Sequence, residues 1–454
     1  MKDREQRVIY VLVALVVLLA LLIVAEREGF LPQVSGRLDE ILDGAAWNRE
    51  KQNFKQGDLL GKRQQQELRE NWLLEEGARV KLLDAARLCV PGQDWLSTRY
   101  AEFRLRHDRE DEPISCEQIH TFANNLGIVE GLNMHGDAEY SADHSPFGDM
   151  SPLEFTQKVL MREVDSRDLG FRPVEGQSKH YNEEIDFDWG DKGAVSAVRE
   201  QGSIGTCYAF AAAGAVESQL AIHYGVKNVT VSVEHPLECD TEHETIKDQT
   251  IADCGEFGGW PHLVFEFWRN QGGFVAEKDF SYCAGEVDPK TLMPACFPCM
   301  AKGYSEAGCG DHSDLYCNKT STQGQSGKDF CTNKSWLHEK RLGTTTSYKL
   351  LSTDIEEQIQ QIAEEGPSTA VMDATMLQFY HRGVANPWFC SSSAKNHAVL
   401  ITGHGPGWFR VKNSWGPKWG ENGFFRIREG VCGINDIVHS VKVSQQSFGF
   451  SEIQ

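Results

Sequence analysis

Hydrophobic residues form one continuous run near the N-terminus and are spread periodically over the rest of the chain. Residues 8–25 are 18 consecutive positions without a charged side chain. At about 1.5 Å per residue a helix over this run is about 27 Å long, enough to cross a bilayer core. More basic residues precede the run, in residues 1–7, than closely follow it, which places the N-terminus in the cytoplasm. We predict one transmembrane helix, an uncleaved signal-anchor after a cytoplasmic tail; a long cleaved signal peptide is the alternative.

The next segment, residues 26–95, is polar and highly charged. In its later part apolar residues recur at steps of three or four, at Leu83, Ala86 and Val90 among others, which is the spacing of one helix face. The pattern predicts a partly helical stalk. A disordered linker is the alternative for residues 26–60.

Residues 96–185 are predicted to form a small helical unit followed by an extended segment. In the sequence 151–154, Ser151 can cap a helix, Pro152 suits its first position, and Glu154 lies in the first turn. An earlier helix is indicated by residues at steps of three and four: Phe122, Asn125, Val129 and Asn133.

The C-terminal part, residues 186–454, alternates between helical and strand patterns. The alanine-rich sequence 207–224 favours a buried helix that Thr206 can cap and Gly225 can end. Short β-rich runs separated by glycines dominate later, at 398–402, 408–412 and 423–428. Helices first and strands later predict an α+β domain.

Composition narrows the class of protein and its compartment. The 45 Lys and Arg against 66 Asp and Glu give a formal charge of −21; nucleic-acid binding needs clustered cations, so no nucleic-acid partner is expected. Of 13 cysteines, eleven follow residue 200, which favours an oxidising compartment. Three sequons agree with a lumenal or extracellular location and are candidate glycosylation sites: Asn228, Asn318 and Asn333.

One cysteine lies at the first turn of the helix predicted over 207–224. Cys207 follows the sequence Gln201-Gly-Ser-Ile-Gly-Thr. A helix N-terminus carries partial positive charge and free N–H groups, which stabilise a thiolate. The Gln201 amide, together with the Cys207 backbone N–H, can hold the oxyanion of a tetrahedral intermediate. The pattern indicates a cysteine nucleophile, although a buried structural cysteine is the alternative.

A base for this thiol is expected at the head of a later apolar strand. His397 begins the run 397–402, and Asn413 follows it by 16 residues with an amide that can orient the imidazole. Trp415 can cover that hydrogen bond from water. The set corresponds to the Cys-His-Asn variant of a catalytic triad, with His404 as the alternative base.

Four separated strings make residues 186–454 resemble the papain-like cysteine peptidases, the family of the lysosomal cathepsins. These strings are 201–210, 258–259, 396–399 and 412–424, with Cys432-Gly433-Ile434 in addition. The resemblance implies a two-lobed α+β fold, with a helical lobe led by the Cys207 helix, a β-barrel-like lobe and a cleft between them. It implies four roles: Cys207 as nucleophile, His397 as general base and acid, Asn413 as orienting residue and Gln201 as oxyanion donor.

The resemblance also bears on substrate binding and on the upstream segment. Gly258, Gly259 and Trp415 are expected to contact substrate, and Ile437 is expected at the base of the pocket for the second residue before the scissile bond, favouring apolar side chains there. Residues 96–185 resemble the family's inhibitory propeptide at the four helix positions given above and at Phe147 and Asp149. Gln118 and Ile114 depart from its usual Arg and Glu.

Departures from the family pattern concern the cysteines. Ile204 stands where the family has a disulfide-forming cysteine, and an insertion occupies about 283–343. Cys390 and Cys432 resemble a pair that is bridged in the family. Zinc bound by Cys296, Cys299, Cys309 and Cys317 is the alternative to disulfides within the insertion. The disulfide candidates are Cys239, Cys254, Cys283, Cys296, Cys299, Cys309, Cys317, Cys331, Cys390 and Cys432.

The function predicted is that of a cysteine endopeptidase, made as a membrane-anchored zymogen and acting on polypeptides through a thioester. Its expected partners are polypeptide substrates, its own propeptide and the membrane, and no cofactor or metal is expected. The catalytic domain is expected in the lysosome or endosome, or outside the cell. After cleavage near residues 184–188 it is either released or held by a disulfide from Cys89 or Cys116. The competing hypothesis is a catalytically idle papain-like domain with a binding or scaffold role.

Overall fold

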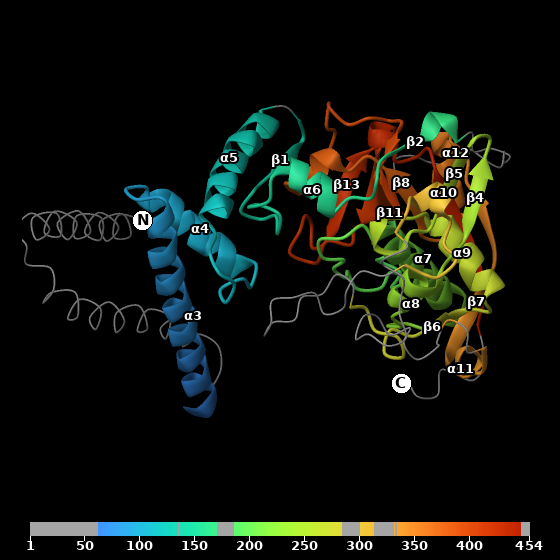
Figure 1. Ribbon diagram of the computed structural model, residues 1–454, viewed down its shortest axis with the longest axis horizontal. Coiled ribbons are helices and arrows are strands. Elements are labelled where there is room, and N and C mark those ends of the chain that lie inside the picture. The colour runs from blue at the N-terminus through green and yellow to red at the C-terminus, as the bar shows by residue number, and fades with distance from the viewer. Residues whose placement is uncertain are drawn as a thin grey trace, which may run out of the picture. The chain divides into compact units, whose positions relative to one another are not determined.

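The computed structural model is shown in Figure 1 and describes residues 62–134, 136–169, 186–283, 300–312, 331 and 334–445. The chain divides into two compact units, residues 1–80 and 81–454. Over the stretches that the structure describes, no helix combines the length and the apolar character needed to cross a bilayer. The run 8–25, predicted as a signal-anchor, lies outside these stretches, as does the stalk before Lys62.

The later part of the predicted stalk is helical. Helix α3 covers Lys62–Cys89, and within the second unit Leu82, Ala86 and Val90 are buried. These positions are four apart and lie on one helix face. Ala86 and Val90 agree with the predicted pattern, whereas Leu82 is buried in place of the predicted Leu83, which is only partly buried. A disulfide joins Cys89 at the end of α3 to Cys116 at the start of α5.

Helices α4 (Asp94–Arg106) and α5 (Cys116–Asn133) pack around an aromatic cluster. The rings of Tyr100 and Phe103 lie 5.4 Å and 4.9 Å from that of Phe122. Asn125, on the same face of α5, donates from Nδ2 to two backbone carbonyls, each at 2.8 Å. The predicted helix over this segment is therefore confirmed; Phe122, Asn125 and Val129 lie on its buried face, whereas Asn133 is exposed.

Helix α6 (Pro152–Lys158) begins as predicted. The Ser151 hydroxyl accepts a hydrogen bond from the Glu154 backbone N–H at 3.2 Å, and Pro152 occupies the first turn. Two short strands flank this helix: β1 (Ala138–Tyr140) pairs with β9, and β2 (Val164–Asp165) pairs with β10. The η1 turn, Ser166–Asp168, follows β2.

The alanine-rich helix α7 covers Cys207–Tyr224 and ends at Gly225, whose φ of 68° is left-handed. Both bounds agree with the prediction. Its residues are buried from Cys207 to Leu220, because α7 packs against α9 (Pro261–Asn270), β8 (Ser368–Met372), β11 (His397–Gly405) and β14 (Val438–Gln445). The predicted side-chain cap by Thr206 is wrong. Its hydroxyl lies instead 3.0 Å from the Tyr282 hydroxyl, a tertiary contact that outcompetes the local cap.

A mainly antiparallel sheet has the strand order β1-β9-β13-β12-β11-β8-β14-β7-β6, with β3 also paired to β11. Its strands after β1 are β3 (Phe187–Asp188), β6 (Phe274–Val275), β7 (Arg341–Leu350), β8 (Ser368–Met372), β9 (Tyr380–Ala385), β11 (His397–Gly405), β12 (Trp408–Lys412), β13 (Phe424–Arg428) and β14 (Val438–Gln445). Smaller elements are β4 (His243–Ile246), β5 (Gln249–Ala252), β10 (Ala394–Lys395) and the turns η2 (Gly255–Phe257), η5 (Thr375–Leu377) and η6 (Val431–Gly433). The predicted strands 398–402, 408–412 and 423–428 correspond to β11, β12 and β13.

Two hydrophobic clusters correspond to the two expected lobes. One surrounds α7 and α9 (Pro261–Asn270), and the other lies among β9, β12 and β13 and continues into the upstream helices α4, α5 and α6. The remaining helices are α8 (Glu234–Cys239), α10 (Glu306–Cys309), α11 (Lys334–Lys340) and α12 (Ile355–Glu365). The α+β class is confirmed.

Candidate active site

The β11–β12 hairpin brings His397 and Asn413 together. Antiparallel pairing joins Leu400 to Lys412, so the first residue of β11 and the residue after β12 lie at the same end of the hairpin. One imidazole nitrogen of His397, Nε2, is 2.8 Å from Asn413 Oδ1. The indole of Trp415 lies over the imidazole at 4.6 Å between ring centroids. The predicted orientation and shielding of His397 are both present.

The α7 helix packs against β11 and places Cys207 beside this pair. The backbone N–H of Ala398, the residue after His397, lies 3.4 Å from Cys207 Sγ. Cys207 is fully buried and is the free thiol among the cysteines that the structure describes. Cys207, His397 and Asn413 therefore converge although 190 residues separate the first two.

Burial holds both groups in their neutral forms. It raises the pKa of the Cys207 thiol to about 12, although N–H groups of Ala398 and of the first turn of α7 act in the opposite direction. Burial also lowers the pKa of His397 to about 4, although Asn413 favours the protonated imidazole. In this covered state the two groups are therefore a neutral thiol and a neutral imidazole.

Gln201, six residues before Cys207, is buried, and each end of its amide is bonded. Its Nε2 donates to the carbonyl oxygens of Val159 at 3.0 Å and Ile204 at 2.6 Å. Its Oε1 accepts from the Ser414 hydroxyl at 2.6 Å. The Val159 carbonyl, upstream of the domain, therefore accepts a hydrogen bond from Gln201 Nε2, the group predicted to stabilise an oxyanion.

Residues 147–169, the covering segment, cross this site. The backbone N–H of Met161 donates to Asn396 O at 2.8 Å, and β2 pairs with β10 immediately before His397. Phe147 and Phe155 lie edge-on against Trp415, with centroids 5.5 Å and 5.3 Å from its ring. The burial of Cys207 and His397 is thus partly supplied by the chain upstream of the domain.

The two glycines predicted to bind substrate contact the covering segment. The Gly259 N–H is 3.5 Å from Met161 Sδ, and a Cβ at Gly258 would lie 3.0 Å from the Met161 side chain. Ile437 is buried in the same hydrophobic cluster as Met161. An apolar side chain therefore lies beside these glycines, where a substrate side chain was expected.

Several other sequence expectations are settled by position. His404 lies farther along β11 and stacks on Phe187 at 5.9 Å, whereas His397 is the histidine oriented by an amide near Cys207. Asn228 is exposed at a turn with φ of 61°. Asn318 and Asn333 lie outside the described residues.

Disulfides tie the insertion to the helical lobe. Cys239 pairs with Cys331 and Cys254 with Cys309, and the pair expected from the resemblance, Cys390–Cys432, is confirmed. Cys309 is therefore not a zinc ligand, because its sulfur is in a disulfide; Cys296, Cys299 and Cys317 lie outside the described residues. Of the two alternatives for the processed domain, a tether through Cys89 or Cys116 is wrong, because these two bond to each other.

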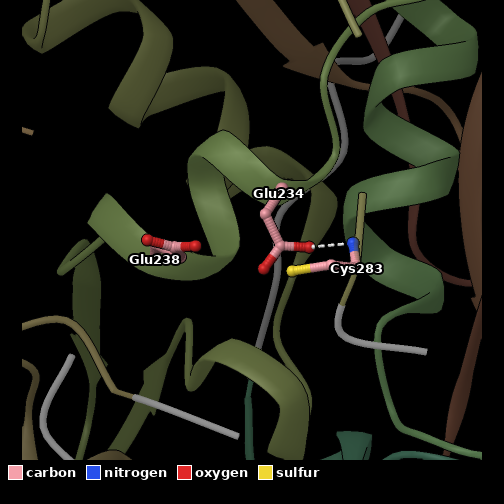
Figure 2. A group of neighbouring side chains, drawn as sticks. All are labelled: Glu234, Glu238 and Cys283. Carbon is pink, nitrogen blue, oxygen red and sulfur yellow. Dashed lines mark hydrogen bonds between the residues drawn. The ribbon is translucent and has the colours of Figure 1, made fainter. Parts of the chain in front are cut away.

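A group of metal-ligand type, Glu234, Glu238 and Cys283, is shown in Figure 2; one possible ligand atom from each lies within 4.8 Å of the others. Cys283 is disulfide-bonded, so it offers no thiolate to a metal. Its backbone N–H donates to Glu234 Oε2 at 2.9 Å (Figure 2). We therefore interpret the group as structural.

Four residues of this site were not predicted from the sequence: Val159, Met161, Ser414 and Tyr282. Ser414 lies between Asn413 and Trp415, which were both predicted to belong to the site, so its position in the sequence could have indicated it. Val159 contacts Gln201 through its backbone carbonyl. Since every residue type has this group, the contact could not be predicted from the residue type.

Comparisons with known proteins agree with this geometry. A family model described as "Papain family cysteine protease" matches residues 184–442. Cysteine proteinase 15A of Pisum sativum is 27% identical over 334 residues, covering 69% of this chain and 78% of that protein. The viral cathepsin of Mamestra configurata nucleopolyhedrovirus is 27% identical over 358 residues, covering 76% and 87%.

Solved structures share the fold. Digestive procathepsin L 3 of Tenebrio molitor larval midgut superposes with a TM-score of 0.56 at 23% identity, covering 76% of this chain and 99% of that one. The proform of the ragweed pollen protease Amb a 11 gives a TM-score of 0.56 at 22% identity, covering 79% and 98%.

Proposed function

The chain belongs to the papain family of cysteine proteases, and on that premise we propose that it is a cysteine endopeptidase made as a membrane-anchored zymogen. The observation that carries the proposal is the convergence of Cys207, His397, Asn413 and Gln201 beneath the covering segment. These residues bring together a thiol, a base oriented by an amide and an oxyanion donor, which are the groups that acyl transfer requires.

In the proposed reaction Cys207 attacks the peptide carbonyl after giving its proton to His397. The oxyanion of the tetrahedral intermediate accepts hydrogen bonds from Gln201 Nε2 and from the Cys207 backbone N–H. His397 then protonates the leaving amine, so the C–N bond breaks and a thioester remains. Water, deprotonated by His397, attacks the thioester and releases the acid and the thiol.

We further infer that residues 96–185 are an inhibitory propeptide. The Val159 carbonyl lies at the oxyanion donor, and Met161 lies beside Gly258 and Gly259. Two of the solved structures with this fold are a procathepsin and a proform, which supports the assignment. Met161 and Ile437 are buried in one hydrophobic cluster, which supports a preference for an apolar side chain two residues before the scissile bond.

The location is part of the same proposal. Residues 8–25 anchor the chain, and the domain lies in the lumen of a lysosome or endosome, or outside the cell. Four described disulfides support an oxidising compartment. Because Cys89 bonds Cys116, cleavage near residues 184–188 leaves no described disulfide between propeptide and domain, so the processed enzyme is free of its anchor.

The test uses residues 26–454, the part expected in the lumen, incubated at pH 4.5 to 7 with a quenched peptide bearing an apolar residue two before the cut. We expect cleavage to appear with loss of the propeptide. A thiol-reactive epoxide inhibitor should stop it and leave its mass on the Cys207 peptide. A processed protein that neither cleaves peptides nor reacts with the epoxide would favour an idle, partner-binding domain instead.

A histidine pair across the propeptide contact predicts how acid promotes release. The rings of His144 and His381 stack at 4.2 Å, with Arg106, Arg382, Asp143, Glu139 and Glu421 also facing them. Burial lowers the pKa of both histidines below the ordinary 6.5, and the charge of His381 lowers the pKa of His144 further. The propeptide therefore binds the domain most tightly above pH 6.5. Its binding weakens as pH falls, because the two histidines take up protons more readily in the released state.

We expect His381→Gln to slow propeptide release at pH 5.5, because it removes a group that binds a proton more readily in the released state than in the docked state. The difference in release rate between His381→Gln and the unaltered chain should vanish at pH 7.5. The measurement is the rate of processing, followed on gels across this pH range. His120→Gln, an exposed histidine on α5, is the matched control. Equal slowing at pH 5.5 and 7.5 would contradict an acid-dependent role.

A further inference from the structure

Tyr282 touches the loop that carries both oxyanion donors. Its hydroxyl lies 2.6 Å from the backbone carbonyl of Gln201 and 3.0 Å from the Thr206 hydroxyl. Gln201 begins this loop and Thr206 directly precedes Cys207. One hydroxyl group therefore bridges the two ends of the loop.

The direction of these hydrogen bonds follows from the chemistry of the groups. A backbone carbonyl only accepts, so the single proton of the Tyr282 hydroxyl is donated to Gln201 O. Thr206 must then donate its own proton to the Tyr282 oxygen. The chain Thr206 O–H to Tyr282 O–H to Gln201 C=O is buried, and buried chains of hydrogen bonds strengthen one another.

The loop needs such support because it contains two glycines. Gly202 has a φ of 71°, and Gly205 is the residue before Thr206. Glycine leaves the backbone free to adopt many conformations. Ser414 holds the opposite side of Gln201, accepting from its backbone N–H at 2.8 Å and donating to its Oε1. Tyr282 supplies the hydrogen bond to the remaining backbone group of Gln201, its carbonyl.

Tyr282 is itself held rigidly. Its ring packs edge-on against Phe210 at 5.0 Å, and its backbone N–H donates to Glu277 Oε1 at 2.5 Å. The next residue, Cys283, is disulfide-bonded and donates its N–H to Glu234 (Figure 2). A hydroxyl mounted in this way can fix the position of a loop to within a fraction of an ångström, as catalytic hydrogen bonds require.

We propose that Tyr282 is a positioning residue that aligns the oxyanion donors Gln201 and Cys207 N–H through its hydroxyl. The proposal rests on the proposed peptidase function and adds a residue to its machinery. On this proposal the Tyr282 hydroxyl helps to stabilise the transition state and does not contribute to substrate binding.

The experiment compares Tyr282→Phe with the unaltered chain after acid processing. We expect kcat to fall about tenfold with KM unchanged, a smaller loss than the 10²–10³-fold cost of removing an oxyanion donor. A peptide aldehyde, whose hemithioacetal oxyanion needs the same donors, should bind about tenfold more weakly. Alkylation of Cys207 by iodoacetamide forms no oxyanion, so its rate should be unchanged.

Two controls separate positioning from general damage. Tyr224→Phe removes a hydroxyl that donates to Val443 O at 3.1 Å, and it should alter neither kcat nor aldehyde binding. In a Gln201→Ala background, Tyr282→Phe should cost much less than it does alone, because the residue it aligns is absent.

The proposal is overturned if Tyr282→Phe leaves kcat and aldehyde binding unchanged, or if it lowers alkylation to the same extent as aldehyde binding. If Tyr282→Phe does not fold, Thr206→Val and Thr206→Ser carry the test, with loss expected only for valine. Failure of the peptidase function itself is distinct, since the unaltered processed chain would then show neither cleavage nor aldehyde binding.

Discussion

Replacing Cys207 by alanine is expected to lower kcat of the processed enzyme on the order of 10⁶-fold, the scale of the loss when a hydrolase loses its nucleophile. Alanine retains the helix start and removes only the sulfur, so the propeptide contacts and the fold should persist. Within the described ranges no other thiol is available to replace it, because Cys207 is the free cysteine there. The remaining rate would come from the oxyanion donors alone.

The measurement must exclude failure of processing as the cause. The Cys207→Ala chain is therefore processed by a trace of active enzyme, which is then blocked with the epoxide inhibitor before the assay. Ser218→Ala, on the same helix with a hydroxyl bonded to Gly214 O, is a control of similar size that should retain activity. Peptide cleavage by processed Cys207→Ala at more than a small fraction of the original rate would exclude Cys207 as the nucleophile.

The residues that bring the site together were predictable because each lies in a strong local pattern. Cys207 follows a glycine-containing turn and begins an alanine-rich helix, and His397 heads an apolar strand. Their convergence follows from antiparallel pairing of β11 with β12 and from α7 packing on β11. The bounds of α7 were predictable for the same reason, since Gly225 supplies the left-handed residue that ends a helix.

Contacts made by single groups across the fold could not be predicted from such patterns. The Thr206 hydroxyl was expected to cap α7, but it binds Tyr282, 76 residues away in sequence. Cys89 and Cys116 pair with each other because α3 and α5 bring their Cα atoms to 5.0 Å, a proximity that spacing alone does not reveal. Val159 contacts Gln201 through a backbone oxygen, which every residue possesses.

The unprocessed chain is expected to resist alkylation at Cys207, whereas the processed enzyme should react readily. Burial raises the thiol pKa from its ordinary 9.0 to about 12, so the thiolate is about 10³-fold rarer at any pH below 9. Burial also lowers the pKa of His397 to about 4, so above pH 4 the imidazole is neutral and forms no ion pair with the sulfur. Removing the covering segment admits water and allows proton transfer from Cys207 to His397. Iodoacetamide should then react at least about 10³-fold faster between pH 5 and 8.

A matched pair of variants on α6 tests whether the covering segment causes this difference. Phe155 is buried against Trp415, whereas Leu153 is 68% exposed on the same helix. In the unprocessed chain Phe155→Ala should open the site and raise the alkylation rate, while Leu153→Ala should leave it unchanged. Because thiolate, not thiol, is the nucleophile, the rate in Phe155→Ala should also rise at a lower pH than in the unaltered chain. Equal rates before and after processing, or equal effects of the two variants, would show that burial by this segment does not control the thiol.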